Sequence, residues 1–145
     1  MRSVARAVLR QWRKAERELE ALDKEYRQII REIDTLRELS LKPPDGLPHG
    51  SGVSNPTEEK AIRILEKLKA RRKRLDEIFY RIEADERLLD RINLAMSLAK
   101  NADLLRRYYH DGVRPMQAVA DEFFVSKRKA WYMENEGVES IEDLL

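Results

Sequence analysis

The sequence predicts an all-α protein in which a long, coiled-coil-like antiparallel helical hairpin precedes a small C-terminal helix-turn-helix module. Three observations carry this prediction. Of the 145 residues, 39% are charged, which is well above the roughly 25% of an average globular domain. The chain has only five glycines and five prolines, too few for a fold built from many turns. Apolar residues also recur in steps of three and four, the spacing of one face of a helix.

The first long helix is expected over residues 5–40. A helix of this length cannot bury its apolar stripe alone, so it needs a partner helix. The stripe continues without a break for more than four heptads, as in a coiled-coil seam. It consists of Ala5, Val8, Trp12, Ala15, Leu19, Leu22, Tyr26, Ile29, Ile33 and Leu36.

Residues 41–55 predict a loop, because they hold three of the five glycines and three of the five prolines and show no helical period. Asn55 is a candidate N-cap for the helix that follows, with Pro56 at the first helical position. Glu58 stands where a capping box places its acid. The second long helix is then expected to run to about Lys100.

An apolar residue repeats at every seventh position of this second helix, at Ala61, Leu68, Leu75, Ile82, Leu89 and Met96. The neighbouring seam positions are mixed, with Leu65 and Phe79 apolar and Arg72, Glu86 and Asn93 polar. On the other side, Ile64, Ile78 and Ile92 widen the stripe. The simplest arrangement is a hairpin within one chain. Alternatively, each helix pairs with its copy in another chain, with Arg72 and Asn93 fixing the register.

The heptads stop near residue 100, so residues 1–100 are expected to form the hairpin domain and residues 101–145 a separate module of short helices. The first of these helices covers residues 101–109, with Leu104, Leu105, Tyr108 and Tyr109 as its apolar face. The stretch His110-Asp111-Gly112 is expected to end it, with glycine at a C-cap position.

The second short helix opens at Pro115 and runs through Phe123. The third begins after the N-cap Ser126, runs from Lys127 to about Asn135 and stops at Gly137, and residues 140–145 add a last turn. Two short helices with a tight turn between them have the dimensions of a helix-turn-helix. Residues expected to pack between them are Met116, Val119, Ala120, Phe123, Val125, Ala130, Trp131 and Met133.

Lys127, Arg128 and Lys129 occupy the first turn of the third helix, where positive charge opposes the helix dipole. A purely structural helix favours acids there, so these cations point to an anionic ligand. In a helix-turn-helix, this end of the second motif helix enters the major groove of DNA. The segment from Lys100 to Tyr132 contains seven basic and four acidic residues, which gives it a net charge of +3. The predicted DNA-binding residues are Ser126, Lys127, Arg128 and Lys129, with Gln117, Arg114, Arg106 and Arg107 as flanking contacts.

Two further charged segments are not expected to form the main DNA-binding surface. The run Lys69–Arg74 is expected to be the solvated face of a long helix, with phosphate contact as the alternative. Residues 133–145 hold five acids and no base, so they are expected to turn away from DNA or to contact a basic partner.

The stretch LLRRYYHDGVRPMQAVADEFFVSKRKAWY resembles the region-4 helix-turn-helix of sigma factors. Together with the two long helices and the loop LPHGSGVSNPTEEKAI, the chain is similar to phage transcriptional regulators of the RinA/ArpU type. This resemblance implies double-stranded DNA as a partner, activation of phage late genes, and host RNA polymerase as a further partner. Phe124 stands where such a turn usually has glycine, which predicts an altered turn or a longer preceding helix.

The composition excludes several classes of function. The absence of cysteine excludes disulfides and cysteine-based metal sites, and the two histidines have no spaced partner for a metal. We find no catalytic constellation, phosphate-binding loop, signal peptide or apolar run long enough for a membrane span. We therefore predict a non-enzymatic protein without cofactor or metal, located in the cytoplasm of a bacterial host, at the nucleoid.

Two other functions remain open at this point. One is a DNA-packaging protein of the small-terminase kind, and the other is a coiled-coil adaptor that binds other proteins. In each case the long helices also offer a surface for homo-oligomerisation.

Overall fold

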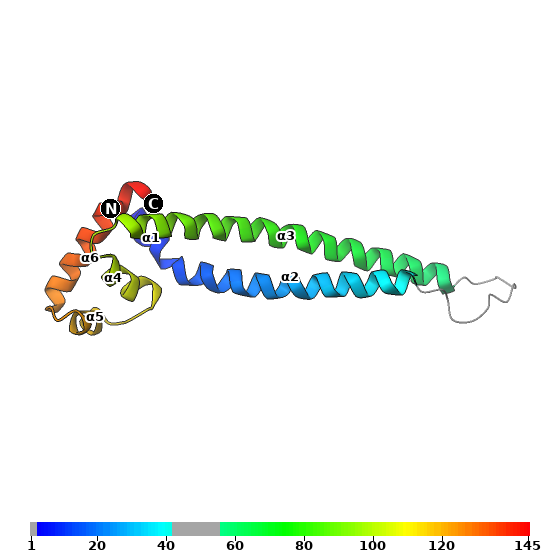
Figure 1. Cartoon of the computed structure of the whole chain (residues 1–145), viewed down its shortest axis with the longest axis horizontal. Helices are drawn as coiled ribbons and strands as arrows, with labels where there is room; N and C mark the ends of the chain where they lie inside the picture. Colours follow the sequence, from blue (N-terminus) through cyan, green and yellow to red (C-terminus); the bar gives the residue numbers. More distant parts are fainter. Residues whose placement is uncertain (1–2, 42–55) are drawn as a thin grey trace, which may run out of the picture. The chain divides into compact units, whose positions relative to one another are not determined.

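The computed structural model describes residues 3–41 and 56–145, and within them every regular element is a helix, as the sequence predicts (Figure 1). The predicted loop over residues 41–55, with Asn55 and His49, lies outside the described residues except for Leu41, which ends α2. The elements are α1 Val4–Arg10, α2 Trp12–Leu41, α3 Pro56–Leu98, α4 Ala102–Leu105, the π-helical turn η1 Arg106–His110, α5 Met116–Glu122, α6 Lys127–Ile141 and the 3-10 turn η2 Glu142–Leu144.

The contacts of the chain divide it into two compact units. One unit comprises residues 1–20 together with 83–145, and the other comprises residues 21–82. The division therefore falls at residues 20 and 82 rather than at residue 100. The first turns of α2 and the last turns of α3 belong with the C-terminal helices.

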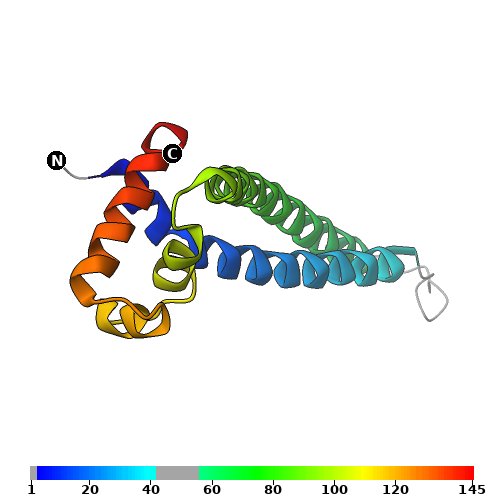
Figure 2. The same ribbon diagram turned by 60° about the vertical axis from the view of Figure 1, so that its left-hand side comes forward.

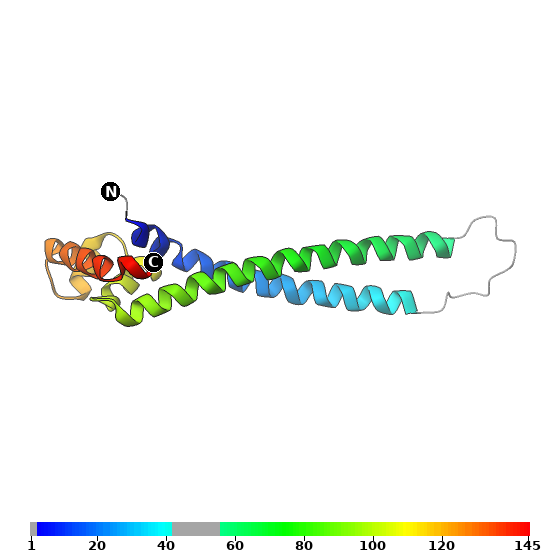
Figure 3. The same cartoon turned by 90° about the horizontal axis from the view of Figure 1, so that it is seen from above.

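Within residues 21–82, α2 and α3 lie side by side and antiparallel in one chain (Figure 3). Glu25 of α2 accepts two hydrogen bonds from Arg74 of α3, at 2.7 and 2.9 Å, and Glu32 pairs with Arg71. Rising residue numbers in α2 thus meet falling numbers in α3. The core of this unit consists of Leu22, Ile29, Ile33 and Ile78, with Tyr26, Leu68, Leu75 and Ile82 packed against it. The intrachain hairpin is confirmed.

The row of residues that completes the α3 seam beside the heptad row differs from the prediction. The isoleucine row faces α2, since Ile64, Ile78 and Ile92 are all buried. Leu65 and Phe79 are instead 57% and 48% exposed, and Arg72, Glu86 and Asn93 are also exposed. The isoleucine row is the more apolar of the two. Its arginine, Arg71, is paired across the seam by Glu32 of α2.

In the unit of residues 1–20 and 83–145, the helix expected over residues 5–40 is broken at Gln11. The Gln11 N–H bonds to the Val8 carbonyl at 3.0 Å, three residues back instead of four, and α2 starts at Trp12. This tighter turn separates α1, which contacts both η1 and α6. The core here consists of Ala5, Leu9, Trp12, Ile92, Ala95, Met96, Leu105, Tyr109, Val138 and Ile141.

The prediction that Gly137 stops the last helix is wrong, because α6 continues to Ile141. Gly137 is buried, and a Cβ at this position would lie 2.5 Å from the Lys100 carbonyl oxygen and 2.9 Å from Leu105 Cδ1. The glycine therefore permits close approach of α6 to the segment that follows α3. Val138 and Ile141, which are buried beyond it, hold the helix in place.

Replacing this glycine gives the first test of the packing. Gly→Ala in an exposed helix interior stabilises by about 1 kcal/mol. For Gly137→Ala we expect the free energy of unfolding to fall by about 2 kcal/mol instead, because the new methyl overlaps a backbone oxygen. Urea denaturation followed by circular dichroism measures the change. A variant as stable as the wild type, or more stable, would show that α6 does not approach Lys100 this closely.

Candidate nucleic-acid interface

Helices α5 and α6 form the two arms of a helix-turn-helix that packs on α4 and η1 (Figure 2). The predicted apolar contacts between them are largely confirmed. Leu104, Met116, Val119, Ala120 and Ala130 form the core, with Phe123, Val125 and Met133 packed against it. Trp131 was expected in this core but lies outside it, with 43% of the residue exposed. Its ring packs edge-on against the ring of Tyr108, with 5.7 Å between the centroids.

The turn between α5 and α6 keeps a left-handed residue without using glycine. Phe124 adopts a φ of 55°, its N–H bonds to the Asp121 carbonyl, and the next N–H, of Val125, bonds to Ala120. Helix α5 is not longer than expected, since it ends at Glu122. A residue with a Cβ pays roughly 1–2 kcal/mol for this conformation. The Phe124 side chain is nevertheless 95% exposed.

Helix α6 begins as the sequence predicts. The Ser126 hydroxyl oxygen accepts a hydrogen bond from the Lys129 N–H at 3.1 Å and so caps the helix. Lys127, Arg128 and Lys129 are exposed, and the first turn contains no acid. Among the described residues, no ion pair involves Lys127 or Arg128. The Lys129 ammonium lies 5.0 Å from the ring centroid of Tyr132.

Arg107 has partners within the protein. It makes a bidentate ion pair with Glu122 of α5, at 2.7 and 2.8 Å, and a third bond to Asp111 at 2.8 Å. These carboxylates raise the pKa of Arg107, and the arginine lowers the pKa of Glu122. The pair ties η1 to the end of α5 and offsets the positive charge that was expected to contact phosphate.

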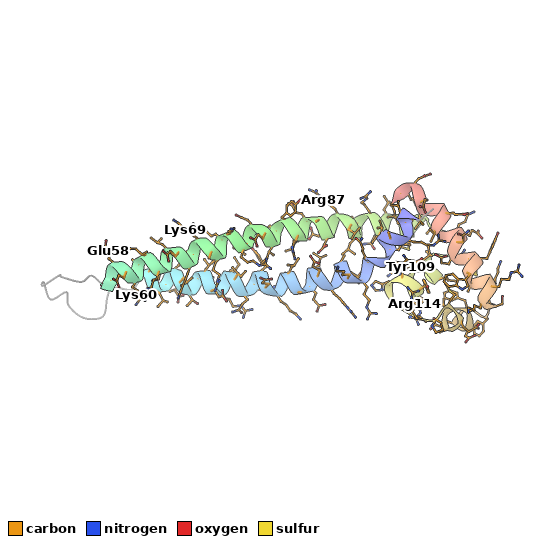
Figure 4. All side chains as sticks on the ribbon, turned by 180° about the vertical axis from the view of Figure 1, so that it is seen from behind. Glu58, Lys60, Lys69, Arg87, Tyr109 and Arg114 are labelled. Carbon is orange, nitrogen blue, oxygen red and sulfur yellow. The ribbon has the colours of Figure 1, made fainter. Side chains whose placement is uncertain are left out.

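The other flanking candidates also contact the protein's own side chains. The Arg114 guanidinium lies 3.2 Å from the ring centroid of Tyr108 and 5.9 Å from that of Tyr109, and burial lowers the pKa of Arg114. Figure 4 shows Arg114 and Tyr109 together in this part of the chain. Arg106 lies 5.2 Å from the Trp12 ring. Gln117 donates a hydrogen bond to Asp121 at 2.8 Å.

The predicted site residues thus fall into two groups. Ser126, Lys127, Arg128 and Lys129 lie together at the exposed start of α6. Arg106, Arg107, Arg114 and Gln117 each have an intramolecular contact that DNA binding would have to share or break. Among the predicted site residues, the exposed cations for which the described residues provide neither an ion pair nor a ring contact are therefore Lys127 and Arg128, at the start of α6.

A buried ionic network that the sequence did not reveal connects the two ends of the chain. Glu134 of α6 is 2% exposed and accepts hydrogen bonds from Arg6 of α1, at 2.9 and 3.2 Å, and from the Tyr109 hydroxyl at 2.8 Å. The bond to Glu134 raises the pKa of Arg6, and burial raises the pKa of Tyr109. Glu142 likewise accepts from the Ser3 hydroxyl at 2.9 Å. The acidic C-terminal segment thus meets basic groups of its own chain, Arg6 at Glu134 and Lys100 at Glu136.

His110 also makes contacts that the sequence did not predict. Its two ring nitrogens lie 2.7 Å from an Asp111 oxygen and 2.5 Å from a Glu16 oxygen, and its ring packs against Trp12. Both carboxylates raise the pKa of His110, so they favour the charged imidazolium. The histidine therefore links η1 to α2.

Neither a metal site nor a membrane segment is found in residues 3–41 and 56–145. No three His, Asp or Glu side chains there are grouped to hold a metal ion. No helix there combines the length and the apolar character that crossing a bilayer requires.

Comparisons with family models, curated proteins and solved structures found no match. The resemblance to RinA/ArpU-type regulators therefore stays a prediction that rests on the quoted motifs.

Proposed function

We propose that this protein is a DNA-binding transcriptional regulator that places the start of α6 in the major groove. The observation that carries the proposal is the exposed cluster at this start, where Lys127 and Arg128 have no ion pair among the described residues. Cations in the first turn oppose the helix dipole, and no carboxylate in that turn compensates them. A polyanion is the ligand that would satisfy such a surface.

Each residue at the start of α6 has a distinct chemical role in this proposal. The oxygen of Ser126 accepts the capping hydrogen bond, which leaves its hydroxyl proton to donate to a phosphate. Lys127 and Arg128 reach base edges and phosphates, where arginine can donate two parallel bonds to guanine. Lys129, held over Tyr132, contributes positive charge beside them.

The packing behind these residues supports the proposal. Ala120 and Ala130 are fully buried where α5 and α6 meet, so the helices cross closely. The Arg107–Glu122 pair and the Glu134 network fix α5 and α6 against η1 and α1. A rigid support of this kind positions a recognition helix without further ordering on binding.

We further propose that the regulator activates phage late genes, with host RNA polymerase as a partner and with the long hairpin as a spacer or oligomerisation arm. These roles follow from the resemblance and from the motif together. Native mass spectrometry of the free and DNA-bound protein distinguishes a transcriptional regulator from a DNA-packaging protein. A monomer or dimer on a promoter fragment agrees with regulation, and a ring of many copies would indicate a packaging protein.

Salt dependence of DNA binding tests the proposed function. If about four cations contact phosphates, the dissociation constant should rise roughly a hundredfold between 50 and 200 mM salt, because bound counterions are released. The measurement is fluorescence anisotropy with fragments selected from phage or host DNA. Absence of binding at 50 mM salt, or an affinity that does not change with salt, would contradict the proposal.

A further inference from the structure

Phe124 combines two unusual properties at one position. Its side chain is 95% exposed, the highest value among the large apolar residues of the described chain. Its backbone has a φ of 55°, a left-handed conformation that bulky residues rarely adopt and that glycine adopts freely. The fold itself therefore gains nothing from a phenylalanine here. Strain at an exposed position indicates a functional contact.

The surroundings of Phe124 indicate what it contacts. It lies two residues before the cap Ser126, next to the exposed cluster Lys127 and Arg128. A ligand that fits both would present an apolar group within a polyanionic surface. The C5 methyl of thymine is the apolar group that duplex DNA presents in its major groove, and phenylalanine is one of the side chains that contacts it.

We propose that Phe124 is a specificity-determining residue that packs against a thymine methyl beside the start of α6. This inference rests on the proposed function and adds the base that the site selects. The phosphate contacts of the positive charges supply affinity that does not depend on sequence, whereas Phe124 distinguishes thymine from cytosine, which lacks the methyl group.

The test uses one duplex made in two forms. A 30-base-pair duplex that the wild-type protein selects from a random pool is synthesised once with thymine and once with deoxyuridine, which lacks only the methyl. Affinities for both forms are measured for the wild type and for Phe124→Gly. Phe124→Asn serves as a second variant, because asparagine also tolerates the left-handed conformation. Thermal unfolding of both variants checks the fold.

We expect the wild type to prefer the thymine duplex by about fourfold for each methyl that Phe124 covers. Both variants should lose this preference, bind the deoxyuridine duplex as the wild type does, and unfold at or above the wild-type temperature. An unchanged preference in the folded variants would overturn the role of Phe124 and leave the proposed function intact. A wild type that selects no duplex from the random pool would overturn both.

Discussion

Reversing the two charges at the start of α6 is expected to abolish DNA binding and to leave the fold intact. The Lys127→Glu, Arg128→Glu variant removes two exposed cations that have no ion pair among the described residues, and it places carboxylates where phosphates are proposed to lie. Losing two such contacts and adding repulsion should weaken binding by at least about a hundredfold. Mobility shift at low salt measures this loss.

The same variant should lose DNA affinity without losing stability against unfolding. Acids in a first turn interact favourably with the helix dipole, by about 0.3–1 kcal/mol each. The charge-reversed protein should therefore unfold at the same urea concentration as the wild type or at a higher one. A loss of binding together with a loss of stability would point to a damaged fold instead of a lost contact.

Helix α3 offers a matched control for the change in net charge. Arg72 and Lys73 are also an adjacent arginine and lysine, and both are exposed. The Arg72→Glu, Lys73→Glu variant changes the net charge by the same amount and is expected to retain DNA affinity within about threefold, as long-range screening by salt predicts. An equal loss of affinity in both variants would assign binding to overall charge and contradict the role of α6.

Removal of the arginine from the buried network should have the largest effect on stability. Arg6→Met leaves the Glu134 carboxylate 2% exposed with Tyr109 as its remaining donor. We expect the free energy of unfolding to fall by about 3 kcal/mol, since breaking a buried pair leaves a charge uncompensated. The double variant Arg6→Met, Glu134→Met should recover most of this loss. Urea denaturation of the two single variants and the double variant gives the coupling energy.

Asp23 and Arg27 provide the surface control for this experiment. They form an ion pair at 3.3 Å with side chains 55% and 69% exposed. Arg27→Met should cost less than about 0.5 kcal/mol, because an exposed pair contributes little in water. If Arg6→Met costs no more than Arg27→Met, the network does not hold α1 to α6.

The main features of the fold could be predicted because they depend on local spacing. The predicted apolar stripe matches the buried face of the first helix from Trp12 to Ile33, since one periodicity determines which residues face inward. In α1 the stripe omits Leu9, which is fully buried. The stripe of α3 had two candidate flanking rows. Choosing between them requires knowledge of Glu32 on the other helix, which meets Arg71. Periodicity within a single helix carries no such information.

The errors at glycine have a related cause. The low helix propensity of glycine predicts that Gly137 stops the helix, but packing against Lys100 determines its role. Conversely, Phe124 adopts a left-handed backbone conformation, which the sequence would have indicated only if a glycine stood at this position. Glycine marks either a left-handed backbone or a close approach, and the sequence does not distinguish the two.

The candidate site was predicted in part. The cap Ser126 and the exposed cations of α6 follow from local rules about helix ends, which the structure bears out. The intramolecular partners of Arg107 and Arg114 do not follow from such rules. Arg107 reaches a residue fifteen positions away, and Arg6 reaches one 128 positions away. Only the tertiary arrangement brings these groups together.

An NMR titration of the ¹⁵N-labelled 145-residue chain with duplex DNA tests the central proposal most directly. We expect the amide signals of residues 126–130 to shift or broaden first, together with those of the turn at Phe124. The signals of residues 69–73 should stay in place until DNA is in large excess. Perturbations centred on α3, with residues 126–130 unaffected at saturation, would contradict the proposed role of α6 in DNA binding.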